Sequence, residues 1–138
     1  MIKLIATLGI SAIIAMETGQ VQNDDLAKSI ERGKMVYSEN CISCHMGTGE
    51  GVIGTFPPLA KADYLTKNHE NAIRAIKFGL MGKVTVNGVE YDNMMPNPGL
   101  DDEEIADVMN YILNTWENKS EKPMITPKQV SLIKQEKG

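Results

Sequence analysis

Apolar residues recur at helical spacing in two stretches of the chain. The earlier stretch predicts an amphipathic helix that begins after the capping residue Asn23 and has the apolar side Leu26, Ile30, Gly33 and Tyr37. A glycine inside a helix costs about 1 kcal/mol relative to alanine. Gly33 therefore indicates that another segment of backbone passes close to this helix; a frayed or kinked helix is the alternative.

The second helical stretch carries the clearest start signal in the sequence. Asp101 can cap the helix, and Glu104 three residues later completes a capping box. The inward side of this helix is predicted to consist of Ile105, Val108, Met109, Ile112 and Trp116.

Shorter elements lie between and after these helices. Residues 68–78 predict a helix that Gly79 ends. Residues 84–91 predict a β-hairpin, because Asn87 and Gly88 suit a two-residue type I′ turn that pairs Val86 with Val89 and Val84 with Tyr91.

A last helix is expected to start at Thr126 and Pro127 and to run to about Lys137. Its apolar stripe of Val130 and Ile133 is thin. We therefore expect this helix to pack weakly or to serve as a docking tail.

The first 16 residues resemble an export signal, with Lys3 followed by an apolar run. Residues 1–16, or up to 19, are predicted to be a signal peptide, and an uncleaved anchor is the alternative. Residues 17–23 would then form a linker, 24–117 the domain and 118–138 a C-terminal tail. Export implies a periplasmic location.

Composition narrows the function. The chain has 138 residues, which suits one domain, and only two Phe, one Trp and four Tyr to fill its core. The formal net charge is −4 and no basic run is present, which argues against a nucleic-acid partner. No phosphate-binding loop is present either.

Residues 41–45 have the pattern C-x-x-C-H, the attachment signature of a c-type haem. The thiols of Cys41 and Cys44 would form thioether bonds to the haem vinyl groups, and His45 would ligate the iron. A redox dithiol and half of a zinc site are the alternatives. The first needs a βαβ context and the second needs four ligands, of which only His69 would remain.

A second iron ligand decides between electron transfer and small-molecule binding. Methionine is the usual second ligand that gives a high potential. Pro96 forces the residue before it into an extended conformation, so Met95 is the favoured ligand and the adjacent Met94 is the alternative. His69 as a second histidine ligand is disfavoured, because a lone histidine at a helix start is normally a solvated surface residue.

With these residues in view, residues 24–117 resemble a class I c-type cytochrome. Gly33 and Tyr37 match the glycine and the aromatic of that family's first helix, and Val108 and Tyr111 match the pair in its last helix. The resemblance implies that the two helices cross at Gly33. The hairpin before the methionine loop is similar to a bacterial subgroup.

The resemblance also implies a ligand set. Pro57 and Leu59 match a P-x-L motif of the family. The carbonyl of its proline would accept a hydrogen bond from the Nδ1–H group of His45. Met95 matches the family's methionine ligand. The expected fold is mainly α, a cytochrome c-like helical domain around one covalent haem c with a small β-hairpin.

The predicted function is electron transfer by a single haem that cycles between Fe(III) and Fe(II), with redox proteins as partners and with no enzyme activity. A mobile carrier is favoured, and a haem subunit held permanently in a larger oxidoreductase is the alternative. A haem enzyme or gas sensor is a third, disfavoured alternative, because it would need an open iron position and hence no firm methionine ligand. Membrane contact is expected only through partners or an uncleaved N-terminal segment.

Overall fold

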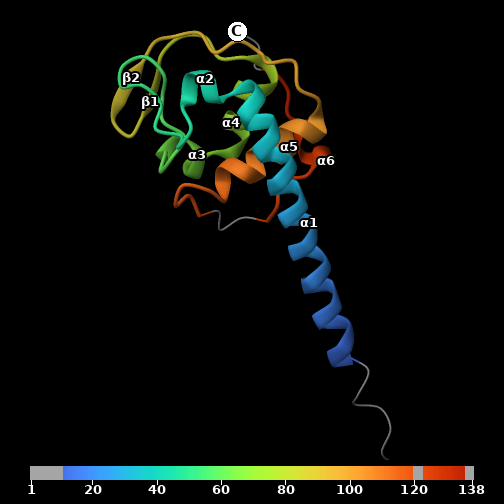
Figure 1. Cartoon of the computed structure of the whole chain (residues 1–138). Helices are drawn as coiled ribbons and strands as arrows, with labels where there is room; N and C mark the ends of the chain where they lie inside the picture. Colours follow the sequence, from blue (N-terminus) through green and yellow to red (C-terminus); the bar gives the residue numbers. More distant parts are fainter. Residues whose placement is uncertain (1–10, 120–122, 136–138) are drawn as a thin grey trace, which may run out of the picture.

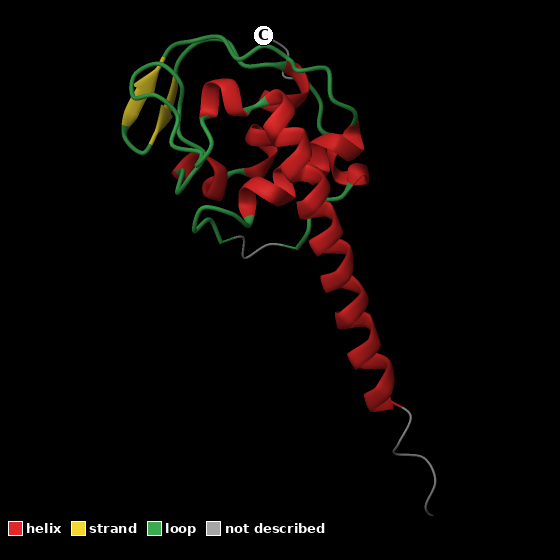
Figure 2. Cartoon of the chain, in the orientation of Figure 1, coloured by secondary structure: helices red, strands yellow, loops and turns green. Residues whose placement is uncertain are grey.

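The computed structural model describes residues 11–119 and 123–135 (Figures 1 and 2). It is mainly helical, with one two-stranded antiparallel sheet. Its elements follow the order α1 (Ser11–Asn40), α2 (Ile42–His45), α3 (Asp63–Lys67), α4 (His69–Phe78), β1 (Val84–Val86), β2 (Val89–Tyr91), α5 (Asp102–Leu113) and α6 (Pro127–Leu132). The expected mainly-α fold with a small hairpin is confirmed. Residues 1–10 of the predicted signal peptide lie outside the described residues.

The first helix is longer than expected. α1 begins at Ser11 and continues through Asn23, so the predicted start at Asn23 is wrong and residues 17–23 are helical. No proline interrupts this stretch, and once a helix is nucleated each further residue costs only a fraction of a kcal/mol. The N-terminal part of α1 projects away from the other elements (Figure 1). Within residues 11–119 and 123–135, no helix combines the length and the hydropathy that a membrane span requires.

α1 crosses α5 at Gly33, as the glycine indicated. A Cβ atom built on Gly33 would lie 2.0 Å from the carbonyl oxygen of Asp107 and 2.9 Å from the Cβ of Tyr111. No side chain fits there, because real Cβ contacts this short do not occur. The glycine therefore sets how closely the two helices approach.

A buried polar cluster lies beside this crossing. Asp107 accepts hydrogen bonds from Ser29 Oγ at 2.6 Å and from Arg32 Nε at 2.6 Å. The hydrogen bond with Asp107 raises the pKa of the Arg32 guanidinium. Asn110 then donates to Ser29 Oγ at 2.8 Å, so the cluster links α1 and α5 through side chains. A buried carboxylate is stable only when it is paired and hydrogen-bonded in this way.

α5 begins as predicted and ends earlier than predicted. Asp101 and Glu104 form the expected capping box. The helix stops at Leu113, so Trp116 is not part of its inward stripe; it lies in the following turn with φ 51°. Its ring packs edge-on against Tyr37 and Tyr111, at centroid distances of 5.0 and 5.5 Å.

The two local predictions between these helices are confirmed. Asn68 caps α4 by accepting from the backbone N–H groups of residues 70 and 71, and Gly79 ends the helix with φ 81°. In the hairpin, Val84 pairs with Tyr91 and Val86 with Val89. The turn residues Asn87 and Gly88 have φ values of 51° and 80°, as a type I′ turn requires.

The C-terminal segment packs into the core, so the expectation of a weakly packed tail is wrong. Val130 on α6 has no exposed surface, and Ile125 before it is also buried. The Asn110 side chain pairs with both the N–H and the carbonyl of Ile125, at 2.8 and 2.9 Å. α6 ends at Leu132 rather than near Lys137, and residues 136–138 lie outside the described part of the chain.

Candidate functional site

The C-x-x-C-H motif forms a helical turn directly after α1. The Cys41 N–H donates to Tyr37 O at 2.9 Å, and the His45 N–H donates to Cys41 O at 3.0 Å. The Tyr37 hydroxyl donates to Met46 O at 2.6 Å and fixes the end of the turn. Cys41 and Cys44 are partly buried free thiols. The long, well-anchored helix α1 therefore holds both thiols and the histidine in place.

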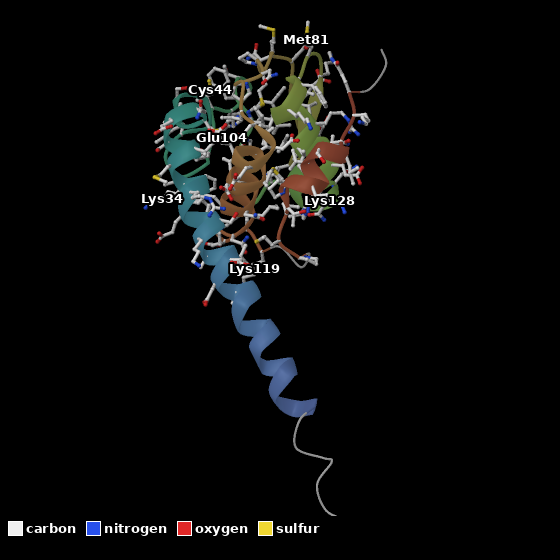
Figure 3. The ribbon with its side chains drawn as sticks, turned by 90° about the vertical axis from the view of Figure 1, so that its right-hand side faces the viewer. Lys34, Cys44, Met81, Glu104, Lys119 and Lys128 are labelled. Atoms are coloured by element: carbon white, nitrogen blue, oxygen red, sulfur yellow. The ribbon has the colours of Figure 1, made fainter. Side chains whose placement is uncertain are left out.

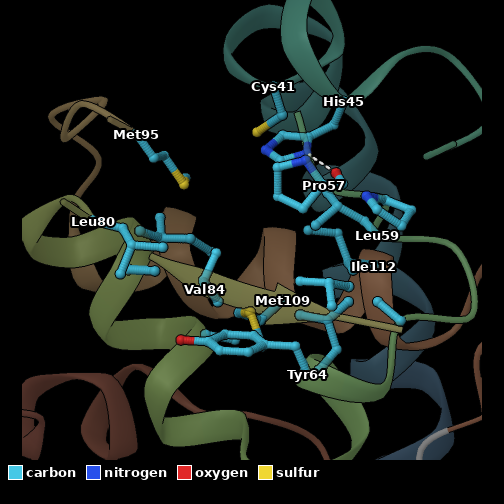
Figure 4. Close-up of a pocket in the computed structure, with 17 residues that line it drawn as sticks. Cys41, His45, Pro57, Leu59, Tyr64, Leu80, Val84, Met95, Met109 and Ile112 are labelled. Carbon is cyan, nitrogen blue, oxygen red and sulfur yellow. Dashed lines mark hydrogen bonds between the residues drawn. The ribbon is translucent and has the colours of Figure 1, made fainter. Parts of the chain in front are cut away.

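His45 is oriented by the loop opposite it. Its side chain is buried, and Nδ1 lies 2.9 Å from the carbonyl oxygen of Pro57 (Figure 4). A carbonyl oxygen only accepts, so Nδ1 carries the proton and Nε2 keeps its lone pair. Burial lowers the pKa of His45, and the hydrogen bond to Pro57 opposes that shift only in part. The imidazole is thus held neutral, as a metal ligand must be.

The loop that carries Pro57 is held by contacts that the sequence did not reveal. Asn118, buried beyond the end of α5, donates to Leu59 O at 2.9 Å and accepts from the Lys61 N–H at 2.7 Å. The Leu59 N–H donates to Gly49 O at 2.7 Å. A Cβ built on Gly49 would lie 2.5 Å from the Trp116 ring, so this ring covers the loop. The sequence placed Asn118 in the C-terminal tail, and only the fold brings it to this loop.

Met95 is held on the other side of the cavity by backbone pairing. Its N–H donates to Leu80 O at 2.8 Å, and its carbonyl accepts from the Leu80 N–H at 2.9 Å. Gly79 has φ 81°, and a Cβ there would lie 2.9 Å from Met95 O, so only glycine permits this pairing. Figure 4 shows the Met95 sulfur pointing across the cavity toward Cys41 and His45. The neighbouring Met94 is 64% exposed.

These groups surround one apolar cavity. Cofactor pockets generally have apolar walls with few polar groups. Its walls come from α3, α4, β1 and α5 as well as from the predicted site residues Cys41, His45, Pro57, Leu59 and Met95. Cys44 lines an adjoining hollow together with His45 and Met95. A flat, apolar cofactor with a metal at its centre fits this donor set.

The Cys41 thiol does not have the acidity that thiol–disulfide exchange requires. Burial, and then the charge of the neighbouring Cys44, raises the pKa of the Cys41 thiol to about 11. Redox-active dithiols have a lowered thiol pKa, because the thiolate is the attacking group. The arrangement therefore disfavours the redox-dithiol alternative.

His69 is not the surface residue that the sequence indicated. It is the first residue of α4 and is only 7% exposed. The expectation of a solvated position is wrong because the start of α4 is covered by the rest of the fold. Among the described residues, those that line the cavity do not include His69.

A comparison with protein families identifies the domain. The family described as cytochrome c matches residues 30–116. The chain belongs to the cytochrome c family. This membership confirms the resemblance drawn from the motifs, and the two helices that cross at Gly33 meet within the matched residues.

Individual cytochromes agree with this result. A cytochrome c-552 of Thermus thermophilus is 38% identical over 96 residues, which cover 66% of this chain and 64% of that protein. Cytochrome c6 of Bumilleriopsis filiformis is 41% identical over 90 residues, which cover 64% of this chain and 93% of that protein. The cytochrome c subunit of a quinone alcohol dehydrogenase from Gluconobacter oxydans is 35% identical over 91 residues, which cover 64% of this chain and 19% of that subunit.

Family membership gives the cofactor and the activity of the matched domain. Cytochromes c bind haem c covalently, and one C-x-x-C-H is present, so the domain carries one covalent haem c. It is an electron-transfer domain and not an enzyme. The chain spans slightly less than two thirds of the length of the Thermus cytochrome c-552.

Proposed function

We propose that His45 and Met95 would be the two protein ligands of the haem iron, and that the whole protein is an extracytoplasmic mobile electron carrier. The observation that carries the ligand assignment is the fixed position of both side chains. His45 is oriented by Pro57 O, and Met95 by the backbone pairing with Leu80. Met94 stands at a largely exposed position, which supports Met95 as the ligand.

The bound haem supplies a one-electron exchange between Fe(III) and Fe(II). The residues of the chain decide how easily this exchange occurs. Two fixed ligands keep the geometry nearly the same in both states, so little rearrangement accompanies the transfer. The apolar walls disfavour the additional positive charge of the ferric state, and the soft thioether of Met95 acts in the same direction. A positive reduction potential follows.

Electrons would enter and leave near Cys44, where the adjoining hollow opens. No charged residue lines this hollow in the described part of the chain. Met94, which lines this hollow, is 64% exposed. Met81 is 81% exposed and lies at the end of the domain away from Lys119 (Figure 3). An uncharged, thioether-rich surface suits the small and short-lived complexes of electron carriers.

Two arrangements of the whole protein fit this domain. The similarity to cytochromes c-552 and c6 favours a mobile carrier. The similarity to a cytochrome c subunit of a quinone alcohol dehydrogenase favours the alternative, a haem subunit fixed in a larger oxidoreductase. The redox partners are donor and acceptor proteins of complementary potential in either arrangement.

Fractionation of native cells followed by gel filtration separates the two arrangements. A carrier is expected in the soluble extracytoplasmic fraction, at the size of a single small protein that carries one haem. Recovery of all haem-stained protein in a large complex or in the membrane fraction would contradict the carrier and support the subunit.

A further inference from the structure

Two loops meet beside the cofactor cavity. The proline loop, residues 46–62, contains the carbonyl that orients His45, and the methionine loop, residues 92–100, contains Met95. Both loops contribute residues to the hollow in which Cys44 lies. A contact between these loops therefore connects the two sides of the site.

One hydrogen bond joins the two loops. Asn93 Nδ2 donates to Thr55 O at 2.8 Å. Both loops lie wholly within the described part of the chain, and among their hydrogen bonds this is the only one that runs from one loop to the other. Thr55 lies two residues before Pro57, and Asn93 lies two residues before Met95. The bond therefore connects the segment that orients the histidine to the segment that carries the methionine.

The acceptor of this bond is held firmly in place. Thr55 belongs to a tight turn in which Val52 and Phe56 pair through two backbone hydrogen bonds of 2.8 Å. The Thr55 N–H also donates to Val52 O at 2.9 Å. Just before this turn, the Gly51 N–H donates to His45 O at 3.1 Å. The backbone thus attaches the turn to the C-x-x-C-H motif, and the Thr55 carbonyl has a fixed direction.

The donor of this bond lies in a segment with few other contacts. The segment runs between two anchors, because Tyr91 at the end of β2 is buried and Met95 pairs with Leu80 through the backbone. Residues 92–94 between these anchors are exposed, and the bond from Asn93 is the only hydrogen bond that these three described residues make. Exposed segments with few contacts open locally at the lowest free energy. The bond from Asn93 is therefore expected to control how often this segment opens.

We propose that Asn93 is a positioning residue for Met95. Its bond to Thr55 O holds the methionine loop against the proline loop and limits how often the Met95 thioether swings away from the cavity. A thioether is a neutral and soft ligand, so its orientation must come from the loop that carries it. This inference deepens the proposed function, because it rests on Met95 as the second iron ligand.

The test is the binding of imidazole to the ferric holoprotein at one fixed pH. Imidazole can occupy the iron only while Met95 is displaced, so its apparent affinity rises with the fraction of the protein in which the loop is open. For Asn93→Ala we expect imidazole to bind about fivefold more tightly, which corresponds to the loss of one ordinary hydrogen bond. Asn93→Asp, which keeps the shape of the side chain and removes its donor, should give a similar or larger increase. Exchange of the Met95 N–H in the holoprotein without imidazole should be faster in both variants.

Two other variants serve as controls. Thr55→Ala is the matched control, because the acceptor is the backbone carbonyl, which alanine keeps. Asn97→Ala is the second, because the Asn97 side chain accepts from the Gly99 N–H within the methionine loop. Both should bind imidazole as the unchanged protein does. Wild-type affinity in Asn93→Ala or Asn93→Asp, or an equal increase in either control, would overturn the proposal.

Met95→Ala separates this inference from the ligand assignment on which it rests. If Met95 is the ligand, this variant has no methionine–iron charge-transfer band and binds imidazole more tightly than Asn93→Ala does. A retained band in Met95→Ala would contradict the ligand set, and the role of Asn93 with it. A lost band in Met95→Ala, together with wild-type imidazole binding in Asn93→Ala, would overturn only the role of Asn93.

Discussion

The two sides of α5 are packed in different ways. On one side, protein atoms fill the space to α1, with Asp107 and Tyr111 in contact with Gly33. On the other side, Met109 and Ile112 face the apolar cavity. A protein interior is normally packed as densely as an organic crystal, so the covalent haem of this domain is expected to complete the packing of the apolar cavity. The difference indicates that the crossing is specified by the chain alone, and the cavity side by the chain together with its haem.

The largest expected effect is loss of order on the cavity side only. Replacement of both Cys41 and Cys44 by serine should leave the haem unattached, and the walls of the cavity should then lose their fixed packing. Backbone amide exchange is expected to become fast in residues 45–100 and to stay slower where α1 crosses α5. If the haem-free protein showed equal protection from amide exchange throughout, the proposed difference between the two sides of α5 would be contradicted.

The crossing of α1 and α5 should be weakened by a substitution at Gly33. Gly33→Ala places a Cβ 2.0 Å from the Asp107 carbonyl, so the helices must separate, at a cost of about 3 kcal/mol in the free energy of unfolding. Chemical denaturation of the holoprotein measures this loss. Gly47→Ala is the control, because nothing lies within 4 Å of a Cβ built there. A loss in the control as large as in Gly33→Ala would refute the argument from close approach.

A smaller loss of stability is expected at Asn118, which connects α5 to the loop that carries Pro57. Asn118→Ala removes the hydrogen bonds to Leu59 O, Ile112 O and the Lys61 N–H, and leaves buried polar groups unpaired. We expect a loss of about 2 kcal/mol in the free energy of unfolding. Asn114→Ala, which removes one bond from an exposed side chain, should cost about 0.5 kcal/mol or less. Equal losses in the two variants would show that Asn118 does not hold the loop.

Elements whose position depends on neighbouring residues in the sequence could be predicted best. The Asn87–Gly88 turn and the Asp101 cap are fixed by neighbours in sequence, and both appear where the sequence predicted them. The start of α1 was missed because a good cap at Asn23 does not prevent a helix from extending further back. A local pattern gives the position of an element more reliably than its length.

The remaining errors concern contacts between distant segments. Trp116 has the spacing of the α5 stripe, yet it packs on Tyr37 from a turn. The thin stripe of α6 hid the complete burial of Val130, and His69 was expected in solvent although it is buried. In the site, the sequence was enough to predict the C-x-x-C-H motif and the candidate residues Pro57, Leu59 and Met95. The hydrogen bond from Asn118 to Leu59 O and the backbone pairing of Leu80 with Met95 could not be predicted, because contacts to the backbone leave no signal in the sequence.

The most direct test of the central claim is the optical spectrum of the purified ferric holoprotein and of two variants. We predict a methionine–iron charge-transfer band in the unchanged protein and in Met94→Ala, and its absence in Met95→Ala, with the haem still bonded to the chain in all three. Loss of the band in Met94→Ala and its retention in Met95→Ala would contradict the proposed ligand set.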